Sequence, residues 1–182
     1  MARVYVFLAN GVEEIEALTA VDVLRRGDLD VVTVSVTGKK EILGSHNISF
    51  KADVLFDEDA LLDGDMLVLP GGGKGTNALM GHEGLRNLLV AYRDAEKFIT
   101  AICAAPSVLG MNGLLKGRKA TCYPGFEDKL LGATVTGEDV VRDGNIITGK
   151  GMGVSVSFAL ALLAAFSPEK AEEVRKKIMF PA

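Results

Sequence analysis

Short apolar runs that alternate with helical segments constrain the fold of this chain more than any other feature. Val4–Ala9, Met66–Leu69 and Phe98–Ile102 are almost wholly apolar, which is typical of strands buried on both faces of a parallel sheet. Helical stretches separate these runs, and a Gly, Pro, Asn or Asp marks the junctions. This order predicts an α/β sandwich with a mainly parallel sheet.

The element boundaries follow from the same pattern. The predicted strands are Val4–Ala9, Asp30–Val36, Met66–Leu69, Phe98–Ile102, Lys119–Thr121 and Asn145–Thr148. The predicted helices are Val12–Arg26, Glu83–Ala95, Ala104–Met111, Val154–Phe166 and a last one near Pro168–Lys177. Hairpins are expected within Ile42–Phe50 and Val140–Ile147. The strand at Lys119–Thr121 is expected to lie beside the strand that ends at Ile102.

Length and composition restrict the class of protein. The 182 residues, 48% of them hydrophobic, predict a single domain spanning residues 1–182. A formal charge of −4 lacks the basic excess of a nucleic-acid-binding surface, so nucleic acid is not an expected partner. The apolar run Phe158–Phe166 is far shorter than the roughly 20 residues of a membrane helix, so no membrane association is expected. The N-terminus does not resemble a signal peptide, which predicts a cytoplasmic protein.

The segment around Cys103 has the layout of a nucleophile elbow. Cys103 directly follows an apolar strand and precedes a helical stretch, and the small residues Ala101 and Ala105 stand two positions to either side. A thiol near a helix N-terminus is favoured as thiolate, so Cys103 is expected to be acidic and reactive. The alternative is that Cys103 is simply a small buried residue.

A glycine run at Gly71–Gly73 ends the neighbouring strand. Its backbone could approach a ligand closely, so the N–H of Gly72 or Gly73 is predicted to form an oxyanion hole with that of Ala104. A phosphate-binding loop does not fit the spacing of the surrounding residues. A purely structural glycine turn remains an alternative.

One carboxyl group interrupts the apolar face of the first predicted helix. The residues of that face are Val12, Glu16, Thr19, Ala20 and Val23. Burial there would raise the pKa of Glu16 and suit it to acid, base or hydrogen-bond donor chemistry beside the thiol; a half-exposed Glu16 is the alternative. Glu13 and Glu14 are expected to serve the helix N-terminus and solvent.

The histidines and cysteines exclude two common site types. The two histidines, His46 and His82, both precede Cys103, so a Cys-His hydrolase with a downstream base is not indicated. Neither the histidines nor the two cysteines show the spacing of metal ligands, and no metal or other cofactor is expected. Cys103 and Cys122 cannot form a disulfide framework.

Five segments in order make the sequence similar to the ThiJ/PfpI superfamily, in the branch of the parkinsonism-associated deglycase and its bacterial ThiJ-like relatives. The segments are Asn10–Arg26, Leu67–Leu79, Ala101–Gly110, Ala120–Leu130 and Thr148–Leu162. The resemblance implies a flavodoxin-like three-layer sandwich of the class I glutamine amidotransferase-like type, and a homodimer. It also implies a peroxide-sensitive nucleophile at Cys103, a protonated Glu16 that donates to it, and an oxyanion-binding amide at Gly72.

The sequence departs from the family pattern at two places. Relatives carry a His where Tyr123 stands, which leaves Glu16 as the acid or base and counts against proteolysis. An arginine pair near the thiol of relatives matches Arg26 and, less well, His46. Tyr123 and Arg26 are therefore secondary candidates for the site, and Cys122, as the second thiol, is another.

The resemblance implies a cofactor-free glyoxalase III-like lyase or deglycase that acts on methylglyoxal, glyoxal or their protein adducts, with a role in the oxidative-stress response. The alternatives are a non-enzymatic redox sensor or chaperone whose Cys103 is oxidised by peroxide, and a cysteine protease. Cys122 is a candidate resolving thiol for Cys103, with a buried core cysteine as the alternative. A scaffold with a vestigial site is a third class.

Overall fold

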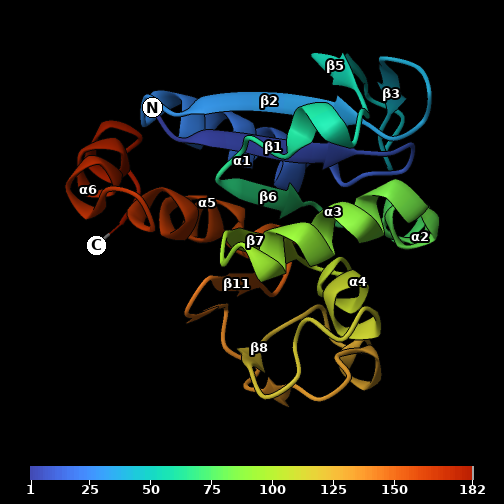
Figure 1. Cartoon of the computed structure of the whole chain (residues 1–182). Helices are drawn as coiled ribbons and strands as arrows, with labels where there is room; N and C mark the ends of the chain where they lie inside the picture. Colours follow the sequence, from blue (N-terminus) through green and yellow to red (C-terminus); the bar gives the residue numbers. More distant parts are fainter. Residues whose placement is uncertain (182) are drawn as a thin grey trace.

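The computed structural model describes residues 1–181 and shows a three-layer α/β sandwich (Figure 1). Its main sheet has the strand order β10-β11-β7-β6-β1-β2-β5. All neighbouring strands pair in parallel except β10 with β11. The strands of this sheet are β1 (Arg3–Leu8), β2 (Asp30–Ser35), β5 (Val54–Leu55), β6 (Met66–Leu69), β7 (Phe98–Ile102), β10 (Val140–Asp143) and β11 (Ile146–Gly149). The predicted α/β sandwich with a mainly parallel sheet is confirmed.

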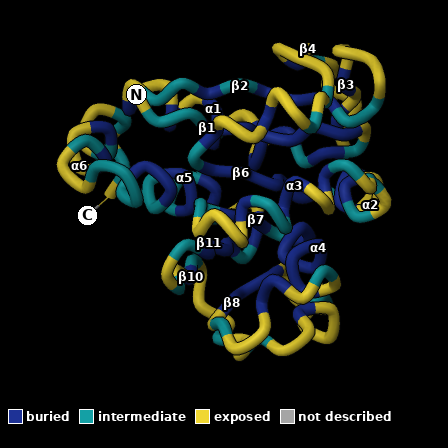
Figure 2. The backbone as a smooth tube through the Cα atoms, in the orientation of Figure 1, coloured by how far each residue is buried: buried dark blue, intermediate teal, exposed yellow. Residues whose placement is uncertain are grey.

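Helices cover both faces of the sheet. They are α1 (Glu14–Arg26), α2 (Gly73–Gly81), α3 (Glu83–Asp94), α4 (Pro106–Met111), α5 (Ser155–Ala164) and α6 (Pro168–Lys177). Strand β1 shows why two cores form: Val4 and Val6 pack with α1, α5 and α6, whereas Tyr5 and Phe7 pack with α3 and α4. Successive side chains of a strand point to opposite faces, so an apolar strand fills both cores. The central strands are accordingly buried along their length (Figure 2).

Smaller elements extend from this sandwich. An antiparallel hairpin of β3 (Glu41–Leu43) and β4 (Ser49–Lys51) confirms the hairpin predicted within Ile42–Phe50. Two residues each of β8 (Lys119–Ala120) and β9 (Thr134–Val135) form a separate parallel pair. Short 3₁₀ turns lie at Asp59–Leu61, Glu127–Lys129 and Met152–Val154. Among the described residues, no helix is both long and apolar enough to cross a membrane.

One topological prediction is wrong. The strand expected at Lys119–Thr121 does not lie beside β7, because the neighbours of β7 are β6 and β11. That position in the sheet is taken by β11, whose Ile146 and Ile147 bury more apolar surface than the polar Lys119 and Thr121 can. The short β8 pairs outside the main sheet instead.

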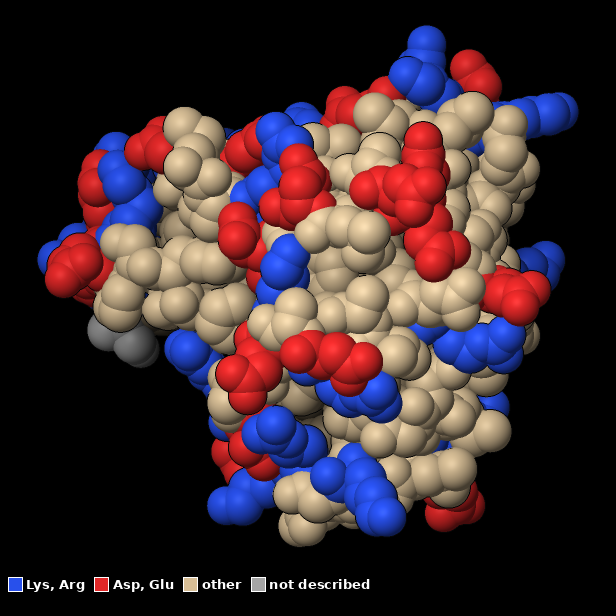
Figure 3. All heavy atoms as spheres, in the orientation of Figure 1, with Lys and Arg blue, Asp and Glu red and all other residues tan. Residues whose placement is uncertain are grey.

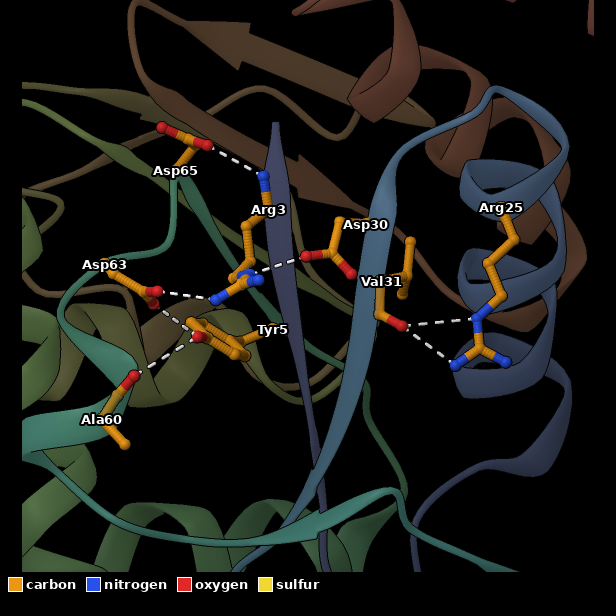
Figure 4. A network of polar contacts seen from close by, with 8 residues as sticks. All are labelled: Arg3, Tyr5, Arg25, Asp30, Val31, Ala60, Asp63 and Asp65. Carbon is orange, nitrogen blue, oxygen red and sulfur yellow. Dashed lines mark hydrogen bonds and ion pairs between the residues drawn. The ribbon is translucent and has the colours of Figure 1, made fainter. Parts of the chain in front are cut away.

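A polar network ties the amino ends of the central strands to the loop before β6 (Figure 4). The guanidinium of Arg3 pairs with Asp30 at 2.7 Å and with Asp63 at 2.6 Å, and its backbone N–H donates to Asp65 at 2.8 Å. The Tyr5 hydroxyl donates to the other oxygen of Asp63 at 2.6 Å. The charged groups at this edge of the sheet are therefore paired with one another and stabilise the fold. The ligand site of an α/β sheet lies at the opposite edge, where the strands have their carboxyl ends.

Candidate active site

A pocket at the carboxyl ends of β6 and β7 brings together the residues that the sequence singled out for chemistry. It has a volume of about 360 Å³. Its lining residues are Glu13, Glu16, Gly72, Gly73, Cys103, Ala104, Tyr123, Phe126 and Met152. The two predicted catalytic residues, the three predicted oxyanion-hole residues and Tyr123 thus share one site.

Cys103 occupies a strained turn directly after β7. Its φ of +65° lies in the left-handed region that L-residues rarely adopt. Two backbone hydrogen bonds hold the turn: the Cys103 N–H donates to the carbonyl of Gly149 at 2.9 Å, and the N–H of Tyr123 donates to the Cys103 carbonyl at 2.8 Å. This geometry is that of a nucleophile elbow, which presents the side chain at the edge of the sheet.

Glu16 lies on the buried face of α1, as its spacing predicts. Only 1% of the residue is exposed. Its Oε2 accepts a hydrogen bond of 2.8 Å from the backbone N–H of Gly71, while Oε1 has no hydrogen-bond partner among the described residues. The Cys103 thiol lies close to this carboxyl group. Burial raises the pKa of Glu16 to about 7, although the Gly71 N–H lowers it.

The glycine run is required by close packing at the site. A Cβ on Gly71 would lie 2.7 Å from the Cβ of Cys103 and 2.7 Å from Oε2 of Glu16. Gly72 has a φ of +89°, and its N–H, together with that of Ala104, points to the Cys103 sulfur. The run then continues into α2, a helix that the sequence analysis did not predict because glycine disfavours helices.

Cys103 and Glu16 form one coupled pair. Burial and the nearby Glu16 carboxylate raise the pKa of the Cys103 thiol to about 12, although the N–H groups of Ala104 and Gly72 lower it. Since the pKa of Glu16 is about 7 and that of the thiol about 12, the negative charge that the pair carries above pH 7 lies on the carboxylate, and the thiol stays protonated.

The prediction that Cys103 is acidic because it lies near a helix N-terminus is therefore wrong. The following helix α4 has only six residues and begins at Pro106, two positions later than predicted. Burial and the Glu16 carboxylate outweigh the N–H groups of Ala104 and Gly72, which lower the pKa of the thiol. Cys103 is therefore a neutral thiol near pH 7, and the Glu16 carboxylate beside it can take its proton as the sulfur reacts.

Two secondary candidates lie away from the pocket. Arg26 stands ten residues after Glu16 on the same helix, about 15 Å along the axis, and pairs with Asp22 at 2.6 Å. Cys122 is 4% exposed and packs in the core on the α3 and α4 side of the sheet, whereas Cys103 packs against the opposite core. Both cysteines are free.

The prediction that Glu14 faces solvent is wrong. Glu14 is 2% exposed, not in solvent, because the β3–β4 hairpin covers it. Its Oε1 accepts a 2.7 Å hydrogen bond from the backbone N–H of His46, and its Oε2 accepts one of 3.0 Å from the Ser45 hydroxyl. The neighbouring Glu13 is half-buried and lines the thiol pocket. The hairpin itself was predicted, but nothing in the sequence indicated that it lies over Glu14.

Phe126 and Met152 also line the pocket without having been predicted. Both belong to segments that carry the family resemblance, but neither has a side chain that signals chemistry.

On the face of the molecule that Figure 3 shows, acidic and basic side chains are mixed over the surface.

Known proteins that resemble this chain identify its family. The model of the DJ-1/PfpI family matches residues 2–165. The chain belongs to the DJ-1/PfpI family. The resemblance to ThiJ/PfpI proteins stated from the sequence is thereby confirmed, and the family accounts for the flavodoxin-like, class I glutamine amidotransferase-like form of the sandwich.

Relatives of this DJ-1/PfpI protein come from several different organisms. Protein DJ-1 homolog A of Arabidopsis thaliana is 40% identical over 176 residues, which cover 96% of this chain and 45% of that protein. The chain spans less than half the length of both Arabidopsis relatives, homologs A and B. Protein dj-1beta of Drosophila melanogaster is 35% identical, with 96% of this chain and 95% of that protein covered. The isonitrile hydratase of Pseudomonas putida is 33% identical over 66% of this chain and 53% of that protein, so the family includes an enzyme.

A solved structure extends the likeness to three dimensions. The structure of oxidized DJ-1 from Toxoplasma gondii has a TM-score of 0.94 at 31% sequence identity, and the match covers 100% of both chains. The whole described chain, including the loops around Cys103, therefore follows the DJ-1 fold.

Proposed function

We propose that this DJ-1/PfpI protein is a cysteine-dependent, cofactor-free enzyme that converts small dicarbonyl compounds such as methylglyoxal and glyoxal to hydroxy acids. This is a glyoxalase III-like activity. The observation that carries the proposal is the convergence of Cys103, the Glu16 carboxyl and the N–H groups of Gly72 and Ala104 at one pocket. Nucleophile, proton carrier and oxyanion donors are the parts that addition to a carbonyl requires.

The first step is addition of the thiol to the aldehyde. The Cys103 sulfur bonds to the aldehyde carbon as its proton passes to the Glu16 carboxylate, and the C=O electron pair moves to oxygen. The N–H groups of Gly72 and Ala104 hold that oxyanion. Return of the proton from Glu16 gives a neutral hemithioacetal.

The later steps use the same carboxyl group. Glu16 removes the hydrogen of the former aldehyde carbon as a proton, which gives an enediolate, and returns that proton to the neighbouring carbon, while the hydroxyl proton on the former aldehyde carbon passes to the oxygen of the neighbouring carbon. The product is a thioester of the 2-hydroxy acid, and the redox change is internal to the substrate. Water then cleaves the C–S bond, which releases the acid and restores the thiol.

Product formation tests the proposal. Wild-type protein should release D-lactate from methylglyoxal, and Cys103→Ser and Glu16→Gln should both abolish it, because nucleophile and proton carrier are each required. Cys122→Ala is the matched control, since it removes the other thiol outside the pocket, and should retain turnover. Undiminished turnover in Glu16→Gln would refute the proton-transfer role.

Alkylation tests the coupled pair without a substrate. The rate of Cys103 modification by iodoacetamide, followed by intact mass, should rise only at pH values well above about 8.5, because burial and the Glu16 carboxylate raise the pKa of the thiol to about 12. In Glu16→Gln this rise should move to lower pH, because the carboxylate that raises the pKa of the thiol is gone. The same rate profile in both proteins would contradict coupling.

Glycated proteins are a second proposed substrate class, which would make the activity that of a deglycase. The partly exposed Cys103 also supports the alternative of a peroxide sensor or chaperone without turnover. Peroxide treatment and the lactate assay separate the enzyme from the sensor. If Cys103 gains oxygen atoms with peroxide but the protein releases no lactate, the sensor is favoured. No histidine is among the residues that line the thiol pocket, which disfavours a cysteine protease.

We further propose that the protein is a cytoplasmic homodimer. Proteins of the family are commonly dimeric, and the exposed apolar side chains of Ile15 and Leu18 on α1, 50% and 41% exposed, favour contact with a second copy. Sedimentation of the wild type against Leu18→Lys tests the dimer.

A further inference from the structure

A second pocket adjoins the thiol pocket and shares a wall with it. The second pocket has a volume of about 320 Å³ and lies between the loop after β8 and the glycine-rich segment after β11. Tyr123 and Met152 line both pockets. A substrate bonded to Cys103 can therefore extend past these two side chains into the neighbouring space.

The shared wall is apolar and partly unburied. Tyr123 is 50% exposed and Met152 is 52% exposed, and the Phe126 ring lies beside them at the thiol pocket. An aromatic ring and a thioether favour contact with apolar and aromatic groups. Among the residues lining the two pockets, the charged ones are Glu13 and Glu16 at the thiol end and Lys150 at the far end.

The backbone fixes this wall relative to the sulfur. The hydrogen bond from the Tyr123 N–H to the carbonyl of Cys103 joins the wall to the nucleophile directly. The N–H of Phe126 donates to the Tyr123 carbonyl at 3.1 Å, which holds the next turn. A Cβ on Gly151 would lie 3.2 Å from Cδ2 of Tyr123, so the Gly151 backbone packs close to this ring.

We propose that Tyr123 and Met152 select the substrate, and that this protein prefers 2-oxoaldehydes with an aryl or bulky alkyl substituent over glyoxal and methylglyoxal. This inference rests on the proposed function. When the aldehyde carbon bonds to sulfur and the ketone carbon lies next to Glu16, the substituent on the ketone carbon extends along the Tyr123–Met152 wall. A cavity of about 150 Å³ holds a benzene ring, so the adjoining pocket has room for a phenyl group.

The expected preference is moderate because the wall is open to solvent. A single methylene in an apolar pocket changes kcat/KM by about 10- to 200-fold. A phenyl group that covers one open wall should fall near the lower end of that range. We therefore expect kcat/KM for phenylglyoxal to exceed that for methylglyoxal by about tenfold.

Steady-state kinetics with glyoxal, methylglyoxal and phenylglyoxal test the preference, with the hydroxy acids measured as products. In Tyr123→Ala and Met152→Ala the ratio of kcat/KM for phenylglyoxal to kcat/KM for methylglyoxal should fall at least about fivefold. The fall should come from a higher KM for phenylglyoxal, because these variants lose apolar contact with the bound substrate. Met111→Ala is the matched control, because Met111 is 50% exposed and lines neither pocket. An unchanged ratio in both wall variants, or a wild-type ratio of one or below, would overturn the inference.

Affinity labelling decides the inference even if turnover is absent. The rates at which 2-bromoacetophenone and bromoacetone alkylate Cys103 are compared, each divided by its rate with free cysteine. The wild type should favour the aromatic reagent, and Tyr123→Ala and Met152→Ala should reduce that selectivity. Selective labelling without hydroxy-acid release would refute the proposed function and retain the pocket, whereas turnover without selectivity would refute only the pocket.

Discussion

The backbone N–H of Gly71 donates a 2.8 Å hydrogen bond to Oε2 of Glu16, and this bond joins the end of strand β6 to the first helix. It holds Oε2 in place, whereas Oε1 is buried without a hydrogen-bond partner in the described chain, and the Cys103 thiol lies beside the carboxyl group. Because the same glycine also lies against Cys103, one backbone position sets the geometry of both proposed catalytic residues.

Substitution Gly71→Ala should damage both the site and the fold. The new Cβ would lie 2.7 Å from Oε2 of Glu16 and 2.7 Å from the Cβ of Cys103, so one of them must move. We expect a loss of about 1–3 kcal/mol in the free energy of unfolding and a loss of lactate release. Urea denaturation and initial rates measure the two effects.

The control for this variant is Gly81→Ala, at the end of α2, where an added Cβ meets no atom within 4 Å. This change should leave stability within about 1 kcal/mol of the wild type or raise it. A Gly71→Ala protein as stable and active as Gly81→Ala would show that the packing at Gly71 is not tight.

The buried Glu16 should make the protein less stable as pH rises. Its pKa is raised from 4.5 to about 7 in the folded state, so the folded protein binds this proton more tightly than the unfolded chain. The stabilisation is fully present below pH 4.5 and is lost as the pH rises through 7, a difference of about 3 kcal/mol. Chemical denaturation at pH 5 and pH 8 should show this loss in the wild type and not in Glu16→Gln. Equal pH dependence in the two proteins would contradict a raised pKa.

Glu14 should show the opposite pH dependence, although it lies two residues away on the same helix. Burial raises its pKa, but the backbone N–H groups of Glu14 and His46 and the Ser45 hydroxyl outweigh burial and lower it to about 2. This stabilisation is present above pH 4.5 and is lost as the pH falls toward 2. Glu14→Gln should therefore be less stable than the wild type at pH 7, with the difference shrinking below pH 4. Thermal unfolding across this pH range measures it, and a constant difference would refute the assignment.

Cys122 should not act as a resolving thiol. It packs in the core on the opposite side of the sheet from Cys103, and burial and Glu127 raise its pKa to about 11, which keeps it as an unreactive thiol. After peroxide treatment, peptide mapping without reductant should find oxygen added at Cys103 and no Cys103–Cys122 linkage. Detection of that disulfide in folded protein would contradict this prediction.

Local pattern was sufficient for most of the fold. Strands β6 and β7 lie at the predicted residues, and the last helix is Pro168–Lys177 as expected. Apolar runs of four to six residues are typical of strands buried on both faces of a parallel sheet in an α/β protein. Helix α2 escaped prediction because its glycines oppose the helix locally, and tertiary packing of Gly75 against Val12 supports it instead.

The sequence by itself determined the kinds of groups at the site: a thiol after a buried strand, a carboxyl group on an apolar helix face and a run of glycines. These depend on local periodicity and on spacing within single segments. Only the tertiary structure decided how Cys103 ionises, which core holds Cys122, and that Glu14 is buried while Arg26 lies far from the thiol. Burial, charge coupling and distance are set by segments far apart in the chain, so no single stretch of sequence contains them.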